Sequence, residues 1–284
     1  MADWNVAGKH ILITGASAGI GKATALDLAR RGAILTLAGR SESRTRKVID
    51  EISGNGGSAG FLLVDLATPS SVKRASLEFL DRAEPLHVLI NNAGVGGTRG
   101  ITAEGFELAF ATNHLGHHLL TRWLVPRLIE CSPARLIVVA SSVHHNVKQV
   151  NWKRIRKRTS SLFGVPEYRT SKLANILDAR RWAQQLEGTG VDVHIVHPGL
   201  VASEIWRDLP LPMRKMFAGK GQTTEDGART PIWAATSPDL EGASGGYYGN
   251  LTEKRISDLA ADADLTDLLW ESTEQWLADW LPPG

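Results

Sequence analysis

The segment that decides the fold is HILITGASAGIG, which covers residues 10–21. Its first five residues are nearly all apolar, as in a strand that is buried on both faces of a parallel sheet. Gly15, Gly19 and Gly21 follow, and helical periodicity begins with them. Glycines permit positive φ angles and let the backbone approach a pyrophosphate, whose charge is stabilised at a helix N-terminus. A glycine-rich turn between a strand and a helix therefore indicates a nucleotide site, whereas such a turn alone is often only a turn.

Short apolar runs recur along the chain and alternate with longer segments of helical periodicity. The predicted strands are His10–Thr14, Ile34–Ala38, Phe61–Val64, Val88–Asn91, Leu136–Ser141 and Val191–Val196, and the predicted helices cover 20–31, 42–53, 69–83, 103–130 and 168–187. This alternation predicts an α/β fold, a doubly wound parallel sheet (Rossmann fold) with helices on both faces. Tyr247–Tyr248, between glycines, adds a seventh short strand. No repeat or linker is visible, so we predict a single domain over residues 1–284.

The composition excludes several classes of protein. Hydrophobic residues make up 43% and charged residues 22%, as in a globular protein. The net charge of +2 is too balanced to suggest a nucleic-acid binder. Cys131 is the only cysteine, which excludes an internal disulfide and a multi-cysteine metal site. No run approaches the ~18 apolar residues of a membrane span, and residues 1–9 do not resemble a secretion signal, so we expect a cytoplasmic protein.

Two segments interrupt the alternation, and both leave the carboxyl ends of predicted strands, where open α/β sheets bind ligands. We predict that residues 143–167 form an insert at the substrate pocket; they are polar and contain the basic run Lys153–Arg158. A solvated face is the ordinary role of such a run, and attraction of an acidic substrate, a carrier protein or a membrane surface is the alternative. The second segment, residues 200–222, carries Trp206, Met213, Met216 and Phe217 among prolines.

Further motifs follow in an order that resembles the short-chain dehydrogenase/reductase family. The turn has that family's spacing T-G-x-x-x-G-x-G. Asp65-Leu66 closes the third predicted strand, and Asn91-Asn92-Ala93-Gly94 closes the fourth. Tyr168 and Lys172 form the motif Y-x-x-x-K, and the sixth strand is followed by His197-Pro198-Gly199-Leu200-Val201-Ala202-Ser203. Ser203 stands where the family more often has threonine. The chain is most similar to the retinol dehydrogenase-like branch, through Ser171-Lys172-Leu173-Ala174-Asn175, the long 143–167 segment and Leu269-Trp270-Glu271-Ser272.

The resemblance implies a nicotinamide dinucleotide bound along the strand ends. The cofactor-binding residues that it implies are Gly15, Ser17, Gly19, Ile20, Gly21, Arg40, Asp65, Leu66, Asn92, Ala93, Gly94, Tyr168, Lys172, Pro198, Gly199, Val201 and Ser203. It also implies that residues 200–222 form a lid over a lipophilic substrate. The apolar lid side chains suit a hydrophobic ketone or aldehyde, and packing of the lid against the domain is the alternative.

Arg40 predicts which dinucleotide binds. An NAD enzyme places a carboxylate at the end of the second strand, against the ribose 2′-hydroxyl. Here Leu37-Ala38-Gly39-Arg40-Ser41 has no acid, and a guanidinium matches a 2′-phosphate with paired hydrogen bonds. We therefore predict NADP(H), with Arg44 assisting; the alternative is that Arg40 is a solvated loop residue.

Tyr168 and Lys172 predict the chemistry. Four residues apart on a helix, their side chains share one face. A phenol with a pKa near ~10 is a poor base at pH 7, and an adjacent ammonium together with an oxidised nicotinamide would favour the phenolate. Tyr168 could then exchange a proton with the substrate oxygen as hydride moves to or from carbon. We predict an NADPH-dependent oxidoreductase that interconverts a carbonyl and its alcohol.

The resemblance assigns two more catalytic residues. Ser142 would donate a hydrogen bond to the substrate oxygen, and Asn113 would hold a water that relays protons to Lys172. The alternatives for the whole protein are a non-catalytic NADP(H)-sensing protein and a reductase of an activated C=C bond.

Other features receive a structural interpretation or stay open. His114, His117 and His118 lack a carboxylate partner in the sequence pattern, so we predict packing or solvation rather than a metal site. His144 and His145 either line the substrate pocket or belong to a polar loop. Trp270, Trp276 and Trp280 should pack the last helix onto the domain or a partner subunit. The resemblance also implies a homodimer or homotetramer formed through the helices at 103–130 and 168–187.

Overall fold

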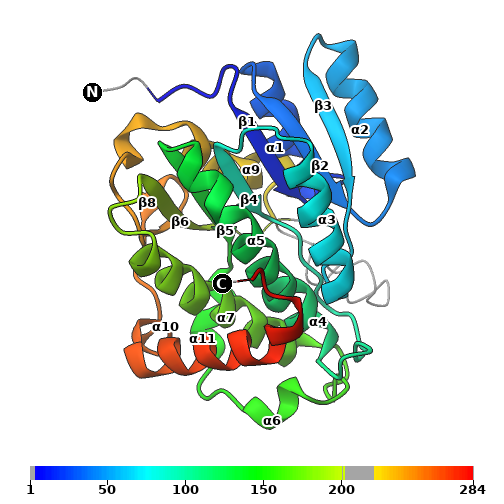
Figure 1. The fold of residues 1–284 in the computed structure, drawn as a ribbon. Helices are drawn as coiled ribbons and strands as arrows, with labels where there is room; N and C mark the ends of the chain where they lie inside the picture. The colour runs from blue at the N-terminus through cyan, green and yellow to red at the C-terminus, as the bar shows by residue number, and fades with distance from the viewer. Residues whose placement is uncertain (1–3, 200, 202–220, 284) are drawn as a thin grey trace.

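The computed structural model describes residues 4–199, 201 and 221–283, and within them one sheet runs through the molecule (Figure 1). Its strands are β1 (His10–Thr14), β2 (Ile34–Gly39), β3 (Ser58–Leu63), β4 (Val88–Asn91), β5 (Ala134–Val139), β6 (Val191–His197), β7 (Tyr247–Gly249) and β8 (Thr252–Glu253). The helical elements are α1 (Gly19–Arg30), α2 (Glu42–Gly54), α3 (Pro69–Asp81), α4 (Leu108–Phe110), η1 (Ala111–Leu115), α5 (Gly116–Glu130), η2 (Ser142–Asn146), α6 (Trp152–Ile155), α7 (Val165–Gln185), α9 (Thr224–Thr236), η4 (Pro238–Leu240), α10 (Asp258–Ala261), α11 (Ala263–Leu277) and η5 (Ala278–Trp280).

The sheet order is β3-β2-β1-β4-β5-β6-β7-β8, and all pairings are parallel except that of β7 with β8. The chain runs outward from β1 in both directions, so the order reverses between β1 and β4, the position where open α/β sheets bind ligands. The predicted doubly wound sheet is thereby confirmed. Strand β8 was not predicted, because it has only two residues and follows a turn in which Asn250 and Leu251 both have positive φ.

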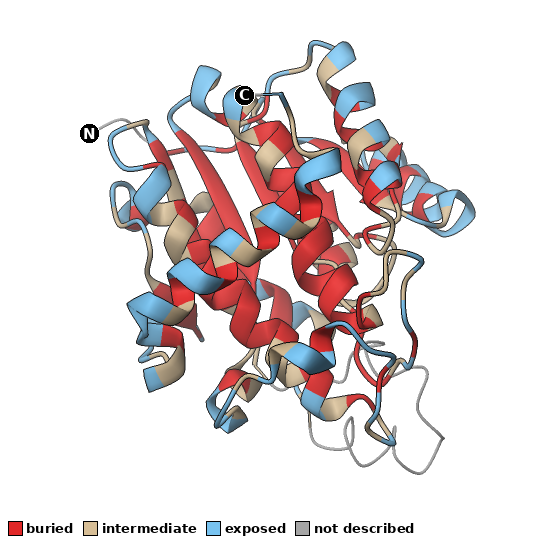
Figure 2. Cartoon of the chain, turned by 60° about the horizontal axis from the view of Figure 1, so that its bottom comes forward, coloured by how far each residue is buried: buried red, intermediate tan, exposed pale blue. Residues whose placement is uncertain are grey.

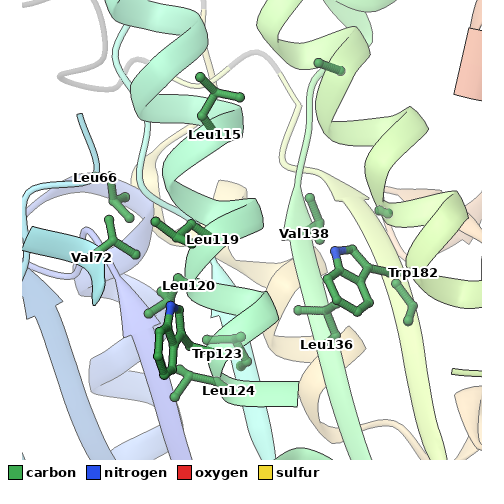
Figure 3. Packing of buried hydrophobic residues seen from close by; sticks show 14 of the residues in the cluster. Leu66, Val72, Leu115, Leu119, Leu120, Trp123, Leu124, Leu136, Val138 and Trp182 are labelled. Carbon is green, nitrogen blue, oxygen red and sulfur yellow. The ribbon is translucent and has the colours of Figure 1, made fainter. Parts of the chain in front are cut away.

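Helices cover both faces of the sheet, and each face has its own core. Helices α1, α2 and α9 pack on one face, whereas α3, α5 and α7 pack on the other. Figure 2 shows the strands buried between the two layers and the outer helix faces exposed. In Figure 3, Leu136 and Val138 of β5 lie between Leu119 of α5 and Trp182 of α7. Nearly all residues of β1, β4 and β5 are buried, which explains their continuous apolar sequences.

Several element boundaries differ from prediction. The predicted helix over 103–130 begins only at Leu108, because residues 101–107 form a turn closed by a bridge between Ile101 and Glu107. A π turn, η1, then precedes α5. Helix α7 begins three residues earlier than predicted, at Val165, after Gly164 with a φ of 62°. Pro166 suits this start, since the first turn of a helix needs no N–H donor there.

Helix α11 packs along α7 (Figure 1), and its Glu274 contacts His118 and Arg122 of α5. The Trp270 ring contacts that of Trp182, with centroids 4.9 Å apart, and the Trp123 indole donates to the Trp280 carbonyl at 2.9 Å. The C-terminal tryptophans therefore pack onto the chain itself. Because α11 covers α5 and α7, it lies over the helices through which the family resemblance implied subunit pairing. Among the described residues, no helix is long and apolar enough to cross a bilayer.

Candidate active site

The glycine-rich turn is folded tightly against the end of β4. Gly15 has a φ of 72°, and a Cβ there would lie 2.8 Å from the Ala93 Cα. A Cβ on Gly21 would lie 2.5 Å from the Asn92 amide nitrogen, which itself donates to the Thr14 carbonyl at 2.8 Å. These two positions therefore require glycine. Together they place the turn beside the start of α1.

The N-terminus of α1 has no side-chain acceptor for its first N–H groups. Its N-cap residue is Ala18, whose side chain cannot accept a hydrogen bond, and no acidic residue lies in the first turn. Uncapped N–H groups at a helix N-terminus, together with the helix dipole, form an anion site. Gly19, with a φ of 57°, lets the backbone enter the helix there.

One groove brings together most of the predicted cofactor-binding residues. Its lining includes Gly15, Ser17, Gly19, Ile20, Gly21, Arg40, Asp65, Leu66, Asn92, Ala93 and Gly94. Arg44 also lines it, as do Val64, Val95 and Thr112, which were not predicted. Asp65 is the only acid among these lining residues, and it lies at the end of β3 rather than at the end of β2. The glycine-rich turn, the uncapped N-terminus of α1, and the side chains of Arg40 and Arg44 fit the phosphate groups of a dinucleotide.

Tyr168 and Lys172 share the inner face of α7, and both side chains are buried, at 6% and 2% exposure. The Lys172 amine lies 5.9 Å from the Tyr168 ring centroid and donates to the Val139 carbonyl at 2.8 Å. The last residue of β5 therefore fixes the lysine. The predicted shared face is present, but the ammonium is directed at a backbone carbonyl.

Burial is the main influence on the pKa values of this pair. Burial raises the pKa of Tyr168 to about 12, although a hydrogen bond with the Ser141 side chain acts in the opposite direction. Burial also lowers the pKa of Lys172 to about 8. Desolvation disfavours both charged forms and outweighs the predicted effect of the ammonium on the phenol. In the protein alone, Tyr168 is therefore a protonated phenol at pH 7.

Ser141 and Ser142 lie just beyond β5. The predicted strand ended at Ser141, whereas β5 ends at Val139. Ser141 is the N-cap of η2, accepts a hydrogen bond from the Val143 N–H and contacts the Tyr168 hydroxyl. Ser142 begins η2, and its hydroxyl has no hydrogen bond to a described residue. The catalytic role of Ser142 stays a prediction, and Ser141 is a residue that the sequence analysis missed.

His144 holds this serine turn in place. Its Nδ1 donates to the Ser141 carbonyl at 2.7 Å, and its Nε2 accepts from the Ser257 N–H at 3.1 Å. Burial lowers the pKa of His144 to about 4, so the ring is neutral and can make both bonds. His145 is exposed and its ring lies against that of His144, with centroids 4.0 Å apart.

Asn113 lies in the π turn η1, a helix irregularity frequent at functional sites. Its side chain accepts from the Val95 N–H and donates to the Val95 carbonyl, at 2.8 and 3.0 Å. It also donates to the Ser171 hydroxyl at 2.9 Å, and Ser171 donates to the Tyr168 carbonyl. Asn113 therefore ties α7 to the loop after β4. The water relay assigned to it stays a prediction.

His117 connects Asn113 with the glycine-rich turn, and the sequence analysis treated it only as a packing residue. Burial lowers its pKa to about 4, so its ring is neutral. Since a carbonyl can only accept, His117 donates from Nδ1 to the Asn113 carbonyl and accepts at Nε2 from the Thr14 hydroxyl, both at 2.9 Å. Thr14 in turn accepts from the Asn92 and Ala93 N–H groups.

Described parts of the segment after β6 lie near the groove. Gly199 has a φ of 87°, and Val201 pairs with Gln222 in an isolated bridge. A Cβ on Gly227 would meet both Val201 and Ile20, so these two residues lie side by side against α9. Pro198, Gly199 and Val201 are not among the groove's lining residues, nor are Tyr168 and Lys172. Ser203, Trp206, Met213, Met216 and Phe217 lie outside the described residues.

The remaining histidines of α5 and η1 contact the C-terminal helix. His114 bonds with the Thr273 hydroxyl at 2.9 Å, and His118 lies between Asp178 and Glu274, at 2.7 Å from each. Each imidazole therefore has protein partners of its own. In the described part of the chain, no group of three or more His, Cys, Asp or Glu side chains is arranged so that it could hold a metal ion.

Comparisons with known proteins agree with this geometry. The family model of short chain dehydrogenases matches residues 9–154. The chain is 37% identical to retinol dehydrogenase 14 of Mus musculus, covering 94% of this chain and 85% of that protein. It is 39% identical to retinol dehydrogenase 12 of Mus musculus, with coverages of 93% and 85%, and 37% identical to dehydrogenase/reductase SDR family member 13 of Homo sapiens, with coverages of 95% and 74%.

Solved structures have the same fold. An uncharacterized protein from Mycobacterium Paratuberculosis superposes with a TM-score of 0.78 at 29% identity, covering 98% of this chain and 97% of that one. A protein from Beutenbergia cavernae, described as an NAD(P) dependent gluconate 5-dehydrogenase and solved with NADP at low occupancy, gives a TM-score of 0.69 at 26% identity, with coverages of 87% and 97%.

Proposed function

The protein belongs to the short-chain dehydrogenase family, and from this premise we propose that it is an NADP(H)-dependent oxidoreductase that interconverts a hydrophobic ketone or aldehyde with its alcohol. The observation that carries the proposal is the buried group formed by Tyr168, Lys172 and Asn113 beside the glycine-lined groove. Relatedness to retinol dehydrogenases supports carbonyl and alcohol chemistry, and because retinol is lipophilic it also supports a lipophilic substrate.

A bound nicotinamide would supply or accept the hydride, and the protein's side chains would handle the proton. Tyr168, which burial keeps protonated, is in the form that donates to a carbonyl oxygen during reduction. Lys172, held by the Val139 carbonyl, would bind the nicotinamide ribose. Ser142 would donate a hydrogen bond to the substrate oxygen, and Asn113 would orient α7 and the proton relay. Alcohol oxidation would use the same groups with the phenol deprotonated.

Replacement of Tyr168 tests this assignment. We predict that Tyr168→Phe lowers turnover by about 10²–10⁴-fold, the range of a lost general acid, while the dissociation constant of NADPH stays within about twofold. Stopped-flow or steady-state NADPH consumption with a panel of hydrophobic ketones and aldehydes measures the turnover. Fluorescence titration measures the dissociation constant of NADPH. Tyr248→Phe is the matched control, because Tyr248 is buried in the core on the other face of the sheet. Normal turnover in Tyr168→Phe would refute the mechanism.

Arg40 carries the proposal that NADP(H) is preferred over NAD(H). Arg40 and Arg44 both line the groove and are exposed, without an ion pair to any described residue. We predict that Arg40→Asp changes the NADP/NAD ratio of kcat/KM by about 10²-fold toward NAD, from a lost charge-assisted bond and a new repulsion. Arg46→Gln is the control, since Arg46 pairs with Glu42 and does not line the groove. An unchanged ratio would mean that another group binds the 2′-phosphate.

The oligomeric state and the location in the cell complete the proposal. A homodimer or homotetramer is the form that the family resemblance implies, and the cytoplasm stays the proposed location. Because α11 covers α5 and α7, we propose that pairing in this protein uses a different face.

A further inference from the structure

A second cavity, of about 360 Å³, lies between the segment after β5 and the first turns of α7. It shares no lining residue with the glycine-lined groove. Its volume lies in the range of small-molecule sites, about 300–1,000 Å³. Residues of the segment 143–167 line the cavity, among them Arg154 of the basic run, and the proposed reaction gives Arg154 no role.

Part of the cavity wall is apolar. Phe110 comes from α4, Ile155 from α6, and Val147 and Pro166 from the two ends of the inserted segment. Phe110 and Ile155 are buried at 2% and 4% exposure, so this part of the wall belongs to the packed core. A ligand here could bury a hydrocarbon body against it.

Three cationic side chains line the same cavity: Lys148, Arg154 and Arg169. None of them forms an ion pair with a described residue. Arg169 is half-buried, and its Nε is fully covered and has no hydrogen-bond partner among the described residues. A covered charged donor without an acceptor is unfavourable, so a carboxylate bound beside the Arg169 guanidinium would be stabilised.

The two carboxylates in the lining are already engaged by neutral donors. Glu107 accepts from the Phe110 N–H at 2.8 Å and from the Thr159 hydroxyl at 2.5 Å. Glu167 accepts from the Ser160 and Ser161 N–H groups, at 3.2 and 3.1 Å. These carboxylates hold the inserted segment against α4 and α7, and neither neutralises an arginine. The cavity therefore combines an apolar wall with unpaired positive charge.

We propose that this cavity binds a small organic carboxylate with a hydrocarbon body, whose carboxylate lies on Arg169. The planar guanidinium presents paired donors that match a carboxylate, and Arg154 and Lys148 add positive charge at the exposed side. Because Arg169 directly follows Tyr168, occupancy of this site would act on the N-terminal turn of the helix that carries the candidate catalytic residue. The proposed site does not depend on the proposed reaction, and it can be tested separately.

Binding of 4-phenylbutyrate and its neutral amide, 4-phenylbutyramide, tests the proposal. Isothermal titration calorimetry is carried out on the full chain with saturating NADPH, so that the glycine-lined groove is occupied. We expect saturable binding of the acid and at least about tenfold weaker binding of the amide, the effect of one lost charge-assisted bond. Equal binding of acid and amide, or no saturable binding of the acid up to about 10 mM, would overturn the proposal.

Variants locate the site. Arg169→Gln should weaken binding of the acid about tenfold or more, and Arg169→Lys should have a smaller effect because it keeps the charge and loses the fork. Arg158→Gln is the matched control, since Arg158 is exposed, belongs to the same basic run and does not line the cavity. An unaltered dissociation constant in Arg169→Gln, with an unfolding midpoint like that of the unmodified protein, would contradict the assignment. Tyr168→Phe should bind the acid normally whether or not the proposed catalysis is correct.

Discussion

At the level of single residues, burial is the main influence on the candidate catalytic groups. Tyr168 and Lys172 both lose water, so the pKa of the phenol rises to about 12 and that of the amine falls to about 8. Each shift favours the neutral form. An acidic tyrosine therefore requires more than the neighbouring lysine, and positive charge brought by an oxidised cofactor is the remaining contribution that we predicted.

Ser141 and Ser142 should have different effects on the reaction when each hydroxyl is removed. Ser142→Ala should lower kcat by about 10²-fold, as for loss of a donor to the substrate oxygen, and leave the pH profile unchanged. Ser141→Ala removes a bond that lowers the pKa of Tyr168, so that pKa should rise. Alcohol oxidation needs the deprotonated phenol, so its rise with pH should move about 0.5 to 1 pH unit higher.

Rates of alcohol oxidation between pH 7 and 11 measure both effects. Thr236→Ser serves as the control, because Thr236 lies at the end of α9, does not line the groove, and its hydroxyl donates to the Ile232 carbonyl, a contact that serine can keep. If instead Ser141→Ala lowers kcat and Ser142→Ala displaces the pH profile, the roles of the two serines are the reverse of those proposed.

At the level of elements, the close approach of α5 to the end of β3 positions the candidate site. A Cβ on Gly116 would lie 2.2 Å from the Leu66 carbonyl oxygen, and Leu66 lines the glycine-lined groove. Figure 3 shows Leu66 beside the α5 side chain Leu119. Because the obstacle is backbone, a side chain here must push the helix away from the sheet. The first turn of α5 directly follows η1, which carries Asn113.

Gly116→Ala should therefore lower the free energy of unfolding by about 1–3 kcal/mol, the cost of overpacking, although alanine favours a helix by about 1 kcal/mol relative to glycine. Urea unfolding measures this loss of stability, and the affinity for NADPH should fall in the same variant. Gly54→Ala, at the end of α2, is the control because a Cβ there meets nothing within 4 Å, and it should be neutral or slightly stabilising. A stabilised Gly116→Ala would show that α5 can move without cost.

At the level of the whole molecule, α11 is joined to the two-layer fold by a buried ionic group. His118 of α5 is fully buried between Asp178 of α7 and Glu274 of α11, and Arg122 also contacts Glu274 at 3.0 Å. Burial alone would lower the pKa of His118, but the two carboxylates together raise it to about 9. The protonated ring therefore links three helices that are distant in sequence.

This group makes a pH prediction for the whole fold. A histidine whose pKa rises from about 6.5 to about 9 on folding stabilises the protein fully below pH 6.5 and loses that contribution as the pH rises through 9. The unfolding free energy should thus fall by on the order of 1–3 kcal/mol between pH 6.5 and 9.5 because of His118. Urea unfolding of the unmodified protein and of His118→Gln at both pH values isolates this term. Equal pH dependence in the two proteins would show that His118 is neutral in the fold.

The sequence alone determined the features that depend on local pattern. Short, nearly continuous apolar runs and helical periodicity predicted the strands, the helices and the doubly wound sheet, because parallel strands between two helix layers are buried on both faces. Gly15 and Gly19 have positive φ and Gly21 leaves room for the Asn92 side chain, so the glycine-rich spacing predicted all three positions. The groove around Arg40, Asp65 and Asn92 followed from the strand ends that carry these residues.

Only the tertiary structure decided contacts between segments far apart in the chain. His118 and Glu274 are 156 positions apart, and no local pattern relates them. Ser141 rather than Ser142 contacts Tyr168 because β5 ends at Val139 and η2 turns the chain there. The high pKa of Tyr168, the cover of α11 over α5 and α7, and the cavity beside Arg169 all arise from packing, which removes water from groups according to their neighbours in space rather than in sequence.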